Sequence, residues 1–171
     1  MTVLFAIDPG LSSGVARGEF SDTEPLVITD QWQTGGGVKG FVDKFAAELY
    51  DQRAIIVCEK FIPRPQSGFS HTLGSTYPLI VEGWLVGNGI MPDYPHERWQ
   101  QPAQRLFMGG DDHDDRVKRA NEFLKKHNLY RTGSQLGQPD GDDANSATLH
   151  AFAFMRKLMH RPTLIKYFKE D

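Results

Sequence analysis

The stretch Val3-Leu4-Phe5-Ala6-Ile7-Asp8-Pro9-Gly10 decides how this chain folds. Five consecutive apolar residues before a turn-forming Pro-Gly pair predict a buried strand over residues 2–8. A carboxylate at the carboxyl end of such a strand points into the crevice where open α/β sheets bind ligands. The glycines that follow would let a phosphate backbone approach the main chain closely. An Asp-Pro-Gly sequence after a strand is also a common turn, and that simpler reading stays open for Asp8 alone.

In the rest of the chain, segments with the apolar spacing of strands are interspersed with segments that have the apolar spacing of helices. Strands are expected over 15–20, as a hairpin partner, over 26–33, over 54–61 and, more briefly, over 90–99. The unbroken apolar run of the 54–61 strand indicates parallel pairing with burial on both faces. Apolar residues at helical spacing predict helices over 40–52, 75–86, 116–127 and 143–159. This mixture predicts an α/β fold.

Bulk composition narrows the functional classes. The 171 residues, 39% hydrophobic and 24% charged, fit one globular domain. No apolar run reaches the length of a membrane span and no secretory signal pattern begins the chain, so a cytoplasmic location is expected. The single cysteine, Cys58, lies in a strand-like run and is expected to be a core residue. A net charge of −3 does not by itself indicate a nucleic-acid binder, although basic residues recur late in the chain.

Three further acidic residues occupy places comparable to that of Asp8. Glu59 closes the apolar run of the 54–61 strand, and Asp140 and Asp143 stand three apart at the start of the last helix, on one side of it. Asp142 would point elsewhere. Carboxylates that converge on one point repel one another unless cations neutralise them, so the pattern suggests divalent metal ions. Simpler explanations are a surface position for Glu59 and stabilisation of the helix dipole by the aspartates.

Other acidic and histidine residues invite a metal interpretation less strongly. The run Asp111-Asp112-His113-Asp114-Asp115 precedes a helix, where capping explains such residues better. His150 follows Asp143 by two helical turns and could face the same point, but a satisfied core or surface histidine is the favoured interpretation. His71 and His96 have no partners at ligand spacing.

In their order and spacing, these features resemble the RuvC family of Holliday junction resolvases, within the ribonuclease H-like superfamily. The resemblance is carried by Ala6-Ile7-Asp8-Pro9-Gly10 with Gly14, by Val57-Cys58-Glu59, and by the segment from Asp140 to Asp143 with its helix. It implies a ribonuclease H-like mixed five-stranded sheet flanked by helices. It also implies a nuclease domain over 1–160 and a C-terminal tail over 161–171.

The resemblance assigns roles to individual residues. It implies that four carboxylates bind metal and serve catalysis, with Mg²⁺ as the cofactor and Mn²⁺ able to replace it: Asp8, Glu59, Asp140 and Asp143. An alignment that brings in Asp142 stays open. The family's lysine near Gln100 is missing here, and an arginine on either side could take its place. The resemblance implies DNA contacts at Arg64, Phe69, Arg98 and Arg105, and the basic stripe late in the chain adds Arg116 and Lys118 as expected contacts.

The expected function is a metal-dependent endonuclease that resolves four-way DNA junctions by paired nicks. Paired nicks require two active sites and therefore a homodimer, for which the 75–86 helix with Trp84 and Leu85 offers an interface. Two alternatives stay open: a related nuclease for flaps, other branched DNA or RNA–DNA hybrids, and a junction-binding protein without catalysis. An actin-like nucleotide-binding fold would need two such lobes, for which 171 residues are too few.

Overall fold

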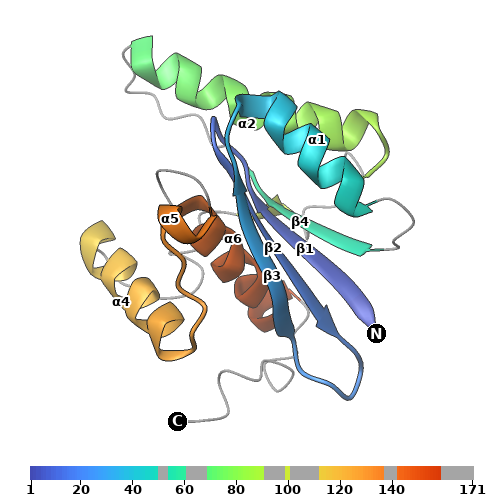
Figure 1. The fold of residues 1–171 in the computed structure, drawn as a ribbon, viewed down its shortest axis with the longest axis vertical. Helices are drawn as coiled ribbons and strands as arrows, with labels where there is room; N and C mark the ends of the chain where they lie inside the picture. The colour runs from blue at the N-terminus through green and yellow to red at the C-terminus, as the bar shows by residue number, and fades with distance from the viewer. Residues whose placement is uncertain (50–53, 61–68, 91–98, 101–111, 137–141, 159–171) are drawn as a thin grey trace.

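The computed structural model contains a mixed β-sheet covered by helices on both faces (Figure 1). The structure describes residues 1–49, 54–60, 69–90, 99–100, 112–136 and 142–158. The sheet has the order β3-β2-β1-β4-β5. Its strands are β1 (Thr2–Asp8), β2 (Ser13–Phe20), β3 (Val27–Thr34), β4 (Ala54–Glu59) and the two-residue β5 (Trp99–Gln100). The α/β prediction is confirmed, with four full strands and only this short pairing in place of the expected 90–99 strand.

Strand directions agree with the hydrophobic pattern. β1 pairs antiparallel with β2 as a hairpin and parallel with β4, and β2 pairs antiparallel with β3. The hairpin turn is closed by Ser13, whose hydroxyl accepts a hydrogen bond from the Gly10 amide at 3.1 Å. The central position of β1 explains its unbroken apolar run, because both of its faces are covered. The carboxyl ends of β1 and β4 consequently lie side by side at one edge of the sheet.

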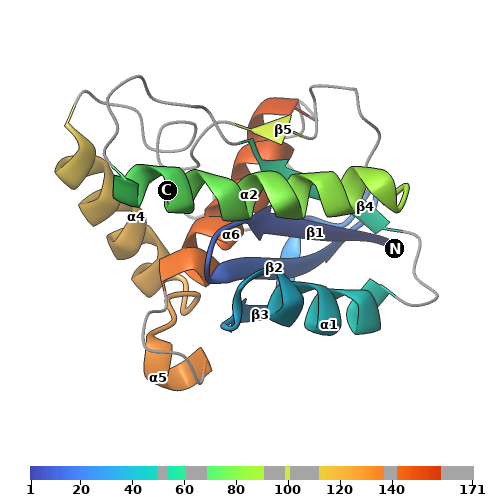
Figure 2. The same cartoon turned by 90° about the horizontal axis from the view of Figure 1, so that it is seen from above.

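Helices form a layer on each face of the sheet. On one face, α1 (Gly37–Leu49) and α2 (Phe69–Gly87) lie side by side in both views (Figures 1 and 2). The other face is covered by α6 (Asp142–Ala153), which continues as the π-helical segment η2 (Phe154–Leu158). Outside α6 lies α4 (His113–Lys126), followed by the single turn α5 (Gly133–Leu136). No helix in the described ranges is long and apolar enough to cross a membrane.

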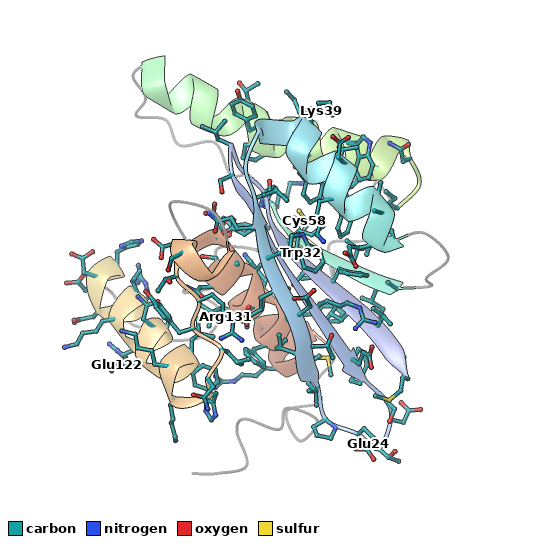
Figure 3. All side chains as sticks on the ribbon, in the orientation of Figure 1. Glu24, Trp32, Lys39, Cys58, Glu122 and Arg131 are labelled. Carbon is teal, nitrogen blue, oxygen red and sulfur yellow. The ribbon has the colours of Figure 1, made fainter. Side chains whose placement is uncertain are left out.

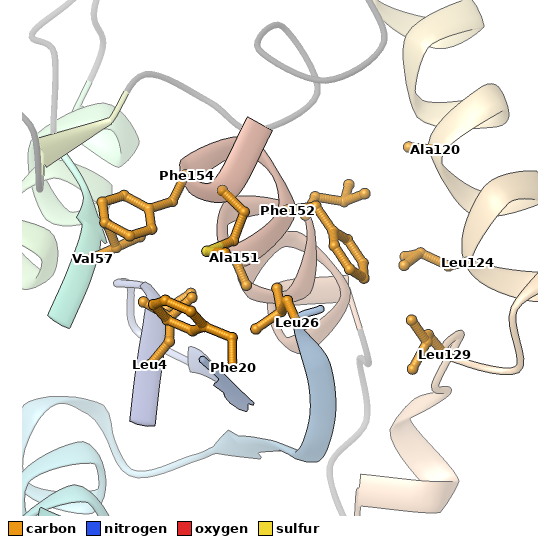
Figure 4. Packing of buried hydrophobic residues seen from close by; sticks show 13 residues of the cluster. Leu4, Phe20, Leu26, Val57, Ala120, Leu124, Leu129, Ala151, Phe152 and Phe154 are labelled. Carbon is orange, nitrogen blue, oxygen red and sulfur yellow. The ribbon is translucent and has the colours of Figure 1, made fainter. Parts of the chain in front are cut away.

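The pleat of β1 divides the core into two clusters. Phe5 and Ile7 face α1 and α2, where they join Phe41, Phe45 and Leu85. Leu4 and Ala6 face α6 on the other side of the sheet. In this second cluster α6 is sandwiched, since Ala151 and Phe154 lie toward the sheet and Phe152 lies toward Leu124 of α4 (Figure 4). The next residue of the alternation that faces α6 is Asp8.

Helix α2 differs from its prediction in two ways. It begins at Phe69 rather than near residue 75, so Phe69 starts a helix instead of lying in a loop. Trp84, expected at an interface between protomers, packs within the chain against Phe41 and Phe45, at ring-centroid distances of 6.0 and 6.4 Å. An apolar helix face looks the same in sequence whether a second helix of the same chain or another protomer covers it. Here α1 covers the face that carries Trp84.

Candidate active site

The parallel pairing of β1 and β4 sets the first two carboxylates beside each other. Ile7 pairs with Cys58, so the residues that follow, Asp8 and Glu59, end adjacent strands at the same height. Side chains alternate along a strand, and Val57 faces α6 whereas Cys58 faces α1 and α2. Glu59 therefore emerges on the α6 side, the same side as Asp8.

The first turns of α6 complete a cluster around Asp8. Partial burial raises the pKa of the Asp8 carboxyl well above its ordinary range. The negative charges of Glu59 and Asp143 raise this pKa further, whereas a hydrogen bond with the Ser146 side chain acts in the opposite direction. Three acidic side chains from β1, β4 and α6 thus lie close enough to interact. A cation bound between them would offset their mutual repulsion.

A close backbone contact fixes where α6 begins. Gly14 pairs directly with Asp8 across the β1–β2 ladder. A Cβ atom at Gly14 would lie 2.0 Å from the carbonyl carbon and oxygen of Asp143, far inside contact distance. Only glycine lets the first turn of α6 approach β2 this closely. This contact places Asp143 next to Asp8.

Polar side chains of β3 form hydrogen bonds with α6. The Gln33 side-chain oxygen accepts a hydrogen bond of 3.4 Å from the Ala144 amide, one of the N-terminal amides that the helix itself leaves unpaired. Two residues earlier, Gln31 donates to the Thr148 hydroxyl at 2.6 Å and to the Leu129 carbonyl at 2.9 Å. Neither glutamine stood out in the sequence as a residue of the site. Their spacing of two residues in a strand, which puts them on one face, was the available signal.

His150 is a satisfied core histidine, as favoured from the sequence, and its hydrogen-bond partner is one of the carboxylates of the cluster. Its ring is fully buried, and its Nε2 atom lies 2.8 Å from Oε2 of Glu59. The sequence placed His150 two turns beyond Asp143 but gave no partner for it. That partner comes from β4, 91 residues earlier in the chain.

The structure describes some of the other residues that the sequence singled out. Asp142 is exposed and lines a hollow together with Ser146, so its direction relative to the cluster stays a prediction. Asp140 lies outside the described residues. Asp112 caps α4 by accepting a hydrogen bond from the Asp114 amide at 2.8 Å, so the capping interpretation of the acidic run is confirmed there.

The single cysteine is a core residue, as expected. Cys58 is fully buried on the α1 and α2 side of the sheet (Figure 3). Burial raises the pKa of its thiol well above the ordinary value, and the charges of Asp8, Glu82 and Glu59 add to this effect. The thiol therefore stays protonated and is a poor nucleophile.

The expected DNA contacts are only partly described. Arg64, Arg98 and Arg105 lie outside the described residues, and of Phe69 only the helical backbone is described. The remaining two lie on α4: Lys118 is exposed, whereas Arg116 is only 8% exposed. The burial of Arg116 favours a role in packing α4 over a contact with DNA.

The donor atoms of the cluster fit a hard divalent cation. Carboxylate oxygens are the ligands that Mg²⁺ and Mn²⁺ prefer, and the pKa of Asp8 is raised first by burial and then by neighbouring negative charge that a cation would offset. Within the described part of the chain, no three acidic, histidine or cysteine side chains are already arranged to share one ion. Beside the cluster, a hollow of about 270 Å³ between α4 and α6 is lined by Asn121, Asp142 and Ser146, among others.

Comparison with solved structures identifies the fold. The fowlpox virus Holliday junction resolvase superposes with a TM-score of 0.58 at 13% identity, over 92% of this chain and 99% of that chain. Thermus thermophilus RuvC gives 0.52 at 16% identity, over 92% and 97%, and its complex with a Holliday junction substrate gives 0.53 at 13%, over 96% and 98%. No protein-family model and no curated protein sequence matches the chain. The chain therefore has the RuvC-like, ribonuclease H-like fold that its sequence motifs predicted.

Gly14→Ala is expected to destabilise the protein by about 1–3 kcal/mol or more, because the new methyl group overlaps the Asp143 backbone. The free energy of unfolding, measured with urea, checks this. Gly87→Ala is the matched control, since a Cβ there meets nothing within 4 Å. Equal stability of the two variants would contradict the close contact between β2 and α6.

Asp8→Asn is expected to stabilise the metal-free protein at neutral pH, because it removes one charge from a repulsive cluster. The raised native pKa means that wild-type stability falls as pH rises from about 4, the unfolded-state pKa, through the native pKa of Asp8. The variant should lose this part of the pH dependence. Thermal melting in EDTA between pH 4 and pH 8 measures both effects. A variant that is less stable than the wild type at neutral pH would argue against the repulsion.

Proposed function

We propose that this protein is a metal-dependent endonuclease that resolves four-way DNA junctions by paired nicks. One observation carries the proposal: carboxylates from β1, β4 and α6 converge around Asp8 and raise its pKa. A site that gathers negative charge at strand ends suits cation-assisted chemistry on a phosphate group.

In the proposed site, Asp8, Glu59 and Asp143 hold the cations, and Asp140 adds a fourth carboxylate. Bound Mg²⁺ or Mn²⁺ would supply an activated water and stabilise the charge that develops on the leaving oxygen. The carboxylates themselves do little proton transfer, since their role is to keep positive charge where the transition state needs it. The Ser146 side chain orients Asp8 through its hydrogen bond.

The substrate class is supported by the fold comparison. The fowlpox virus and Thermus thermophilus proteins that share this fold are described as Holliday junction resolvases or as bound to Holliday junction DNA. At 13–16% identity this likeness concerns the fold, so the same substrate is an inference for this chain. The exposed Lys118 on α4 is a suitable contact for a phosphate backbone.

A two-fold symmetric junction calls for two active sites and hence a homodimer. The exposed side of α2 suits this interface, because Leu79 is 51% and Ile80 is 47% exposed. Gly83 follows on the same stripe, and a Cβ there would meet nothing within 4 Å, so another helix could approach closely. This stripe replaces Trp84, which α1 covers, as the proposed dimer face.

The catalytic proposal is tested with labelled four-way, flap and linear DNA in Mg²⁺, Mn²⁺ or EDTA. The wild type is expected to make paired, symmetric nicks in the four-way junction when either metal is present. Asp8→Asn should reduce cleavage at least about 100-fold, in line with the loss of one electrostatic group at a hydrolytic centre. Asp43→Asn is the matched control, because Asp43 is an exposed aspartate of α1 on the other face of the sheet, and it should cleave nearly as the wild type does.

Equal cleavage by the wild type and Asp8→Asn would refute the proposed site. Preferential cutting of flaps with single rather than paired nicks would retain the nuclease but reject the junction resolvase.

Ile80→Glu is expected to convert a dimer of 19.3 kDa chains into a monomer, because it places a charge in the proposed interface. Light scattering after gel filtration measures the mass, and paired nicks should give way to single nicks. Glu122→Gln, on the outer side of α4, is the control (Figure 3). A wild-type mass for Ile80→Glu, or a monomeric wild type, would rule out this interface.

A further inference from the structure

One side of helix α6 carries a carboxylate of the cluster and the two polar residues that contact the other two described carboxylates. Asp143, Ser146 and His150 are spaced i, i+3 and i+7, so they lie on the same side of the helix. The first contributes its own carboxylate, the second bonds to Asp8, and the third bonds to Glu59. Two of these three residues are therefore polar groups that hold the carboxylates of the strands.

We infer that His150 is a positioning residue, which fixes the orientation of the Glu59 carboxylate for cation binding. This inference rests on the proposed metal-dependent function. Its basis is geometric: the His150 ring is fully buried, the Glu59 side chain is 25% exposed, and Nε2 lies 2.8 Å from Oε2. Cation binding needs an ionised carboxylate, which only accepts hydrogen bonds, so in the proposed site His150 donates from Nε2 to Glu59.

This bond gives the two carboxylate oxygens of Glu59 different partners. Oε2 of Glu59 is occupied by the histidine, which leaves Oε1 for a cation. Glu59 also lies near Asp8, and when both carboxylates are ionised their repulsion would turn a freely rotating Glu59 side chain away from the cluster. The donor from α6 opposes that rotation. Hydrogen-bond partners that orient metal ligands in this way are commonly worth 10–100-fold in metal affinity.

The inference also explains why a polar ring is buried at this point of α6. His150 stands among the buried residues Leu149 and Ala151, where an apolar side chain would continue the core. Burial of an imidazole is costly unless its polar atoms are bonded. The bond to Glu59 meets this requirement at Nε2 and links α6 to β4 at the site.

The test compares His150→Leu, which removes the donor, with His150→Gln, whose amide can place an N–H near the same point. The probe is Mn²⁺ alone, and the readout is the Mn²⁺ concentration at which half of the thermal stabilisation by metal is reached. We expect this midpoint to rise about tenfold in His150→Leu and to stay close to the wild type in His150→Gln. Cleavage of a four-way junction should show the same shift in its Mn²⁺ requirement, with most of the maximal rate kept at saturating Mn²⁺.

Phe152→Leu is the control for stability alone, because Phe152 is buried on the same helix but packs against Phe123 of α4. It should lower the melting temperature without moving the Mn²⁺ midpoint. If His150→Leu does not fold, His150→Asn replaces it, since the shorter amide cannot reach Oε2 of Glu59 and should show the same tenfold rise.

An unchanged or lower midpoint in His150→Leu would overturn the inference, and so would a midpoint in His150→Gln as weak as that in His150→Leu. Failure of the proposed function gives a different result. In that case Mn²⁺ would stabilise the wild type and Asp8→Asn equally, or neither of them, whatever residue stands at position 150.

Discussion

The contact between Gly14 of β2 and the Asp143 backbone of α6 is the constraint on which the site depends. It brings the start of a helix from late in the chain against a hairpin formed by its first twenty residues. Because Gly14 pairs with Asp8, the same contact sets the distance between two carboxylates. The bonds from Gln31 and Gln33 hold α6 in this place along the sheet. Without this packing, Asp143 of α6 would no longer lie next to Asp8 of β1.

The cluster that results is electrostatically unfavourable without a cation. The fold tolerates this repulsion between carboxylates, because two hydrophobic clusters, one on each face of β1, stabilise the strands that carry them. Polar groups from α6 relieve part of the repulsion, through Ser146 at Asp8 and through His150 at Glu59. Functional sites commonly depart from the rules that govern the rest of a fold in this way. We propose that divalent cations complete the balance.

The strands and the positions of their last residues could be predicted from local sequence patterns. An apolar run and its alternation fix both the strand and the face on which its last residue emerges, which was enough for Asp8 and Glu59. Contacts with residues far away in the sequence could not be predicted. His150 could be placed near Asp143 by helical spacing, but its bond to Glu59 depends on how α6 crosses β4. Trp84 was assigned to an interface because nothing in its own helix reveals that Phe41 and Phe45 cover it.

The central claim is that the carboxylates of β1, β4 and α6 form one cation site, and a crystal soaked in Mn²⁺ tests it most directly. Anomalous scattering locates manganese independently of any assumption about the fold. The account predicts a manganese peak in contact with the carboxylates of Asp8, Glu59 and Asp143, which disappears in Asp8→Asn crystals. A cluster without manganese at saturating concentration, or manganese bound there equally in Asp8→Asn, would contradict it.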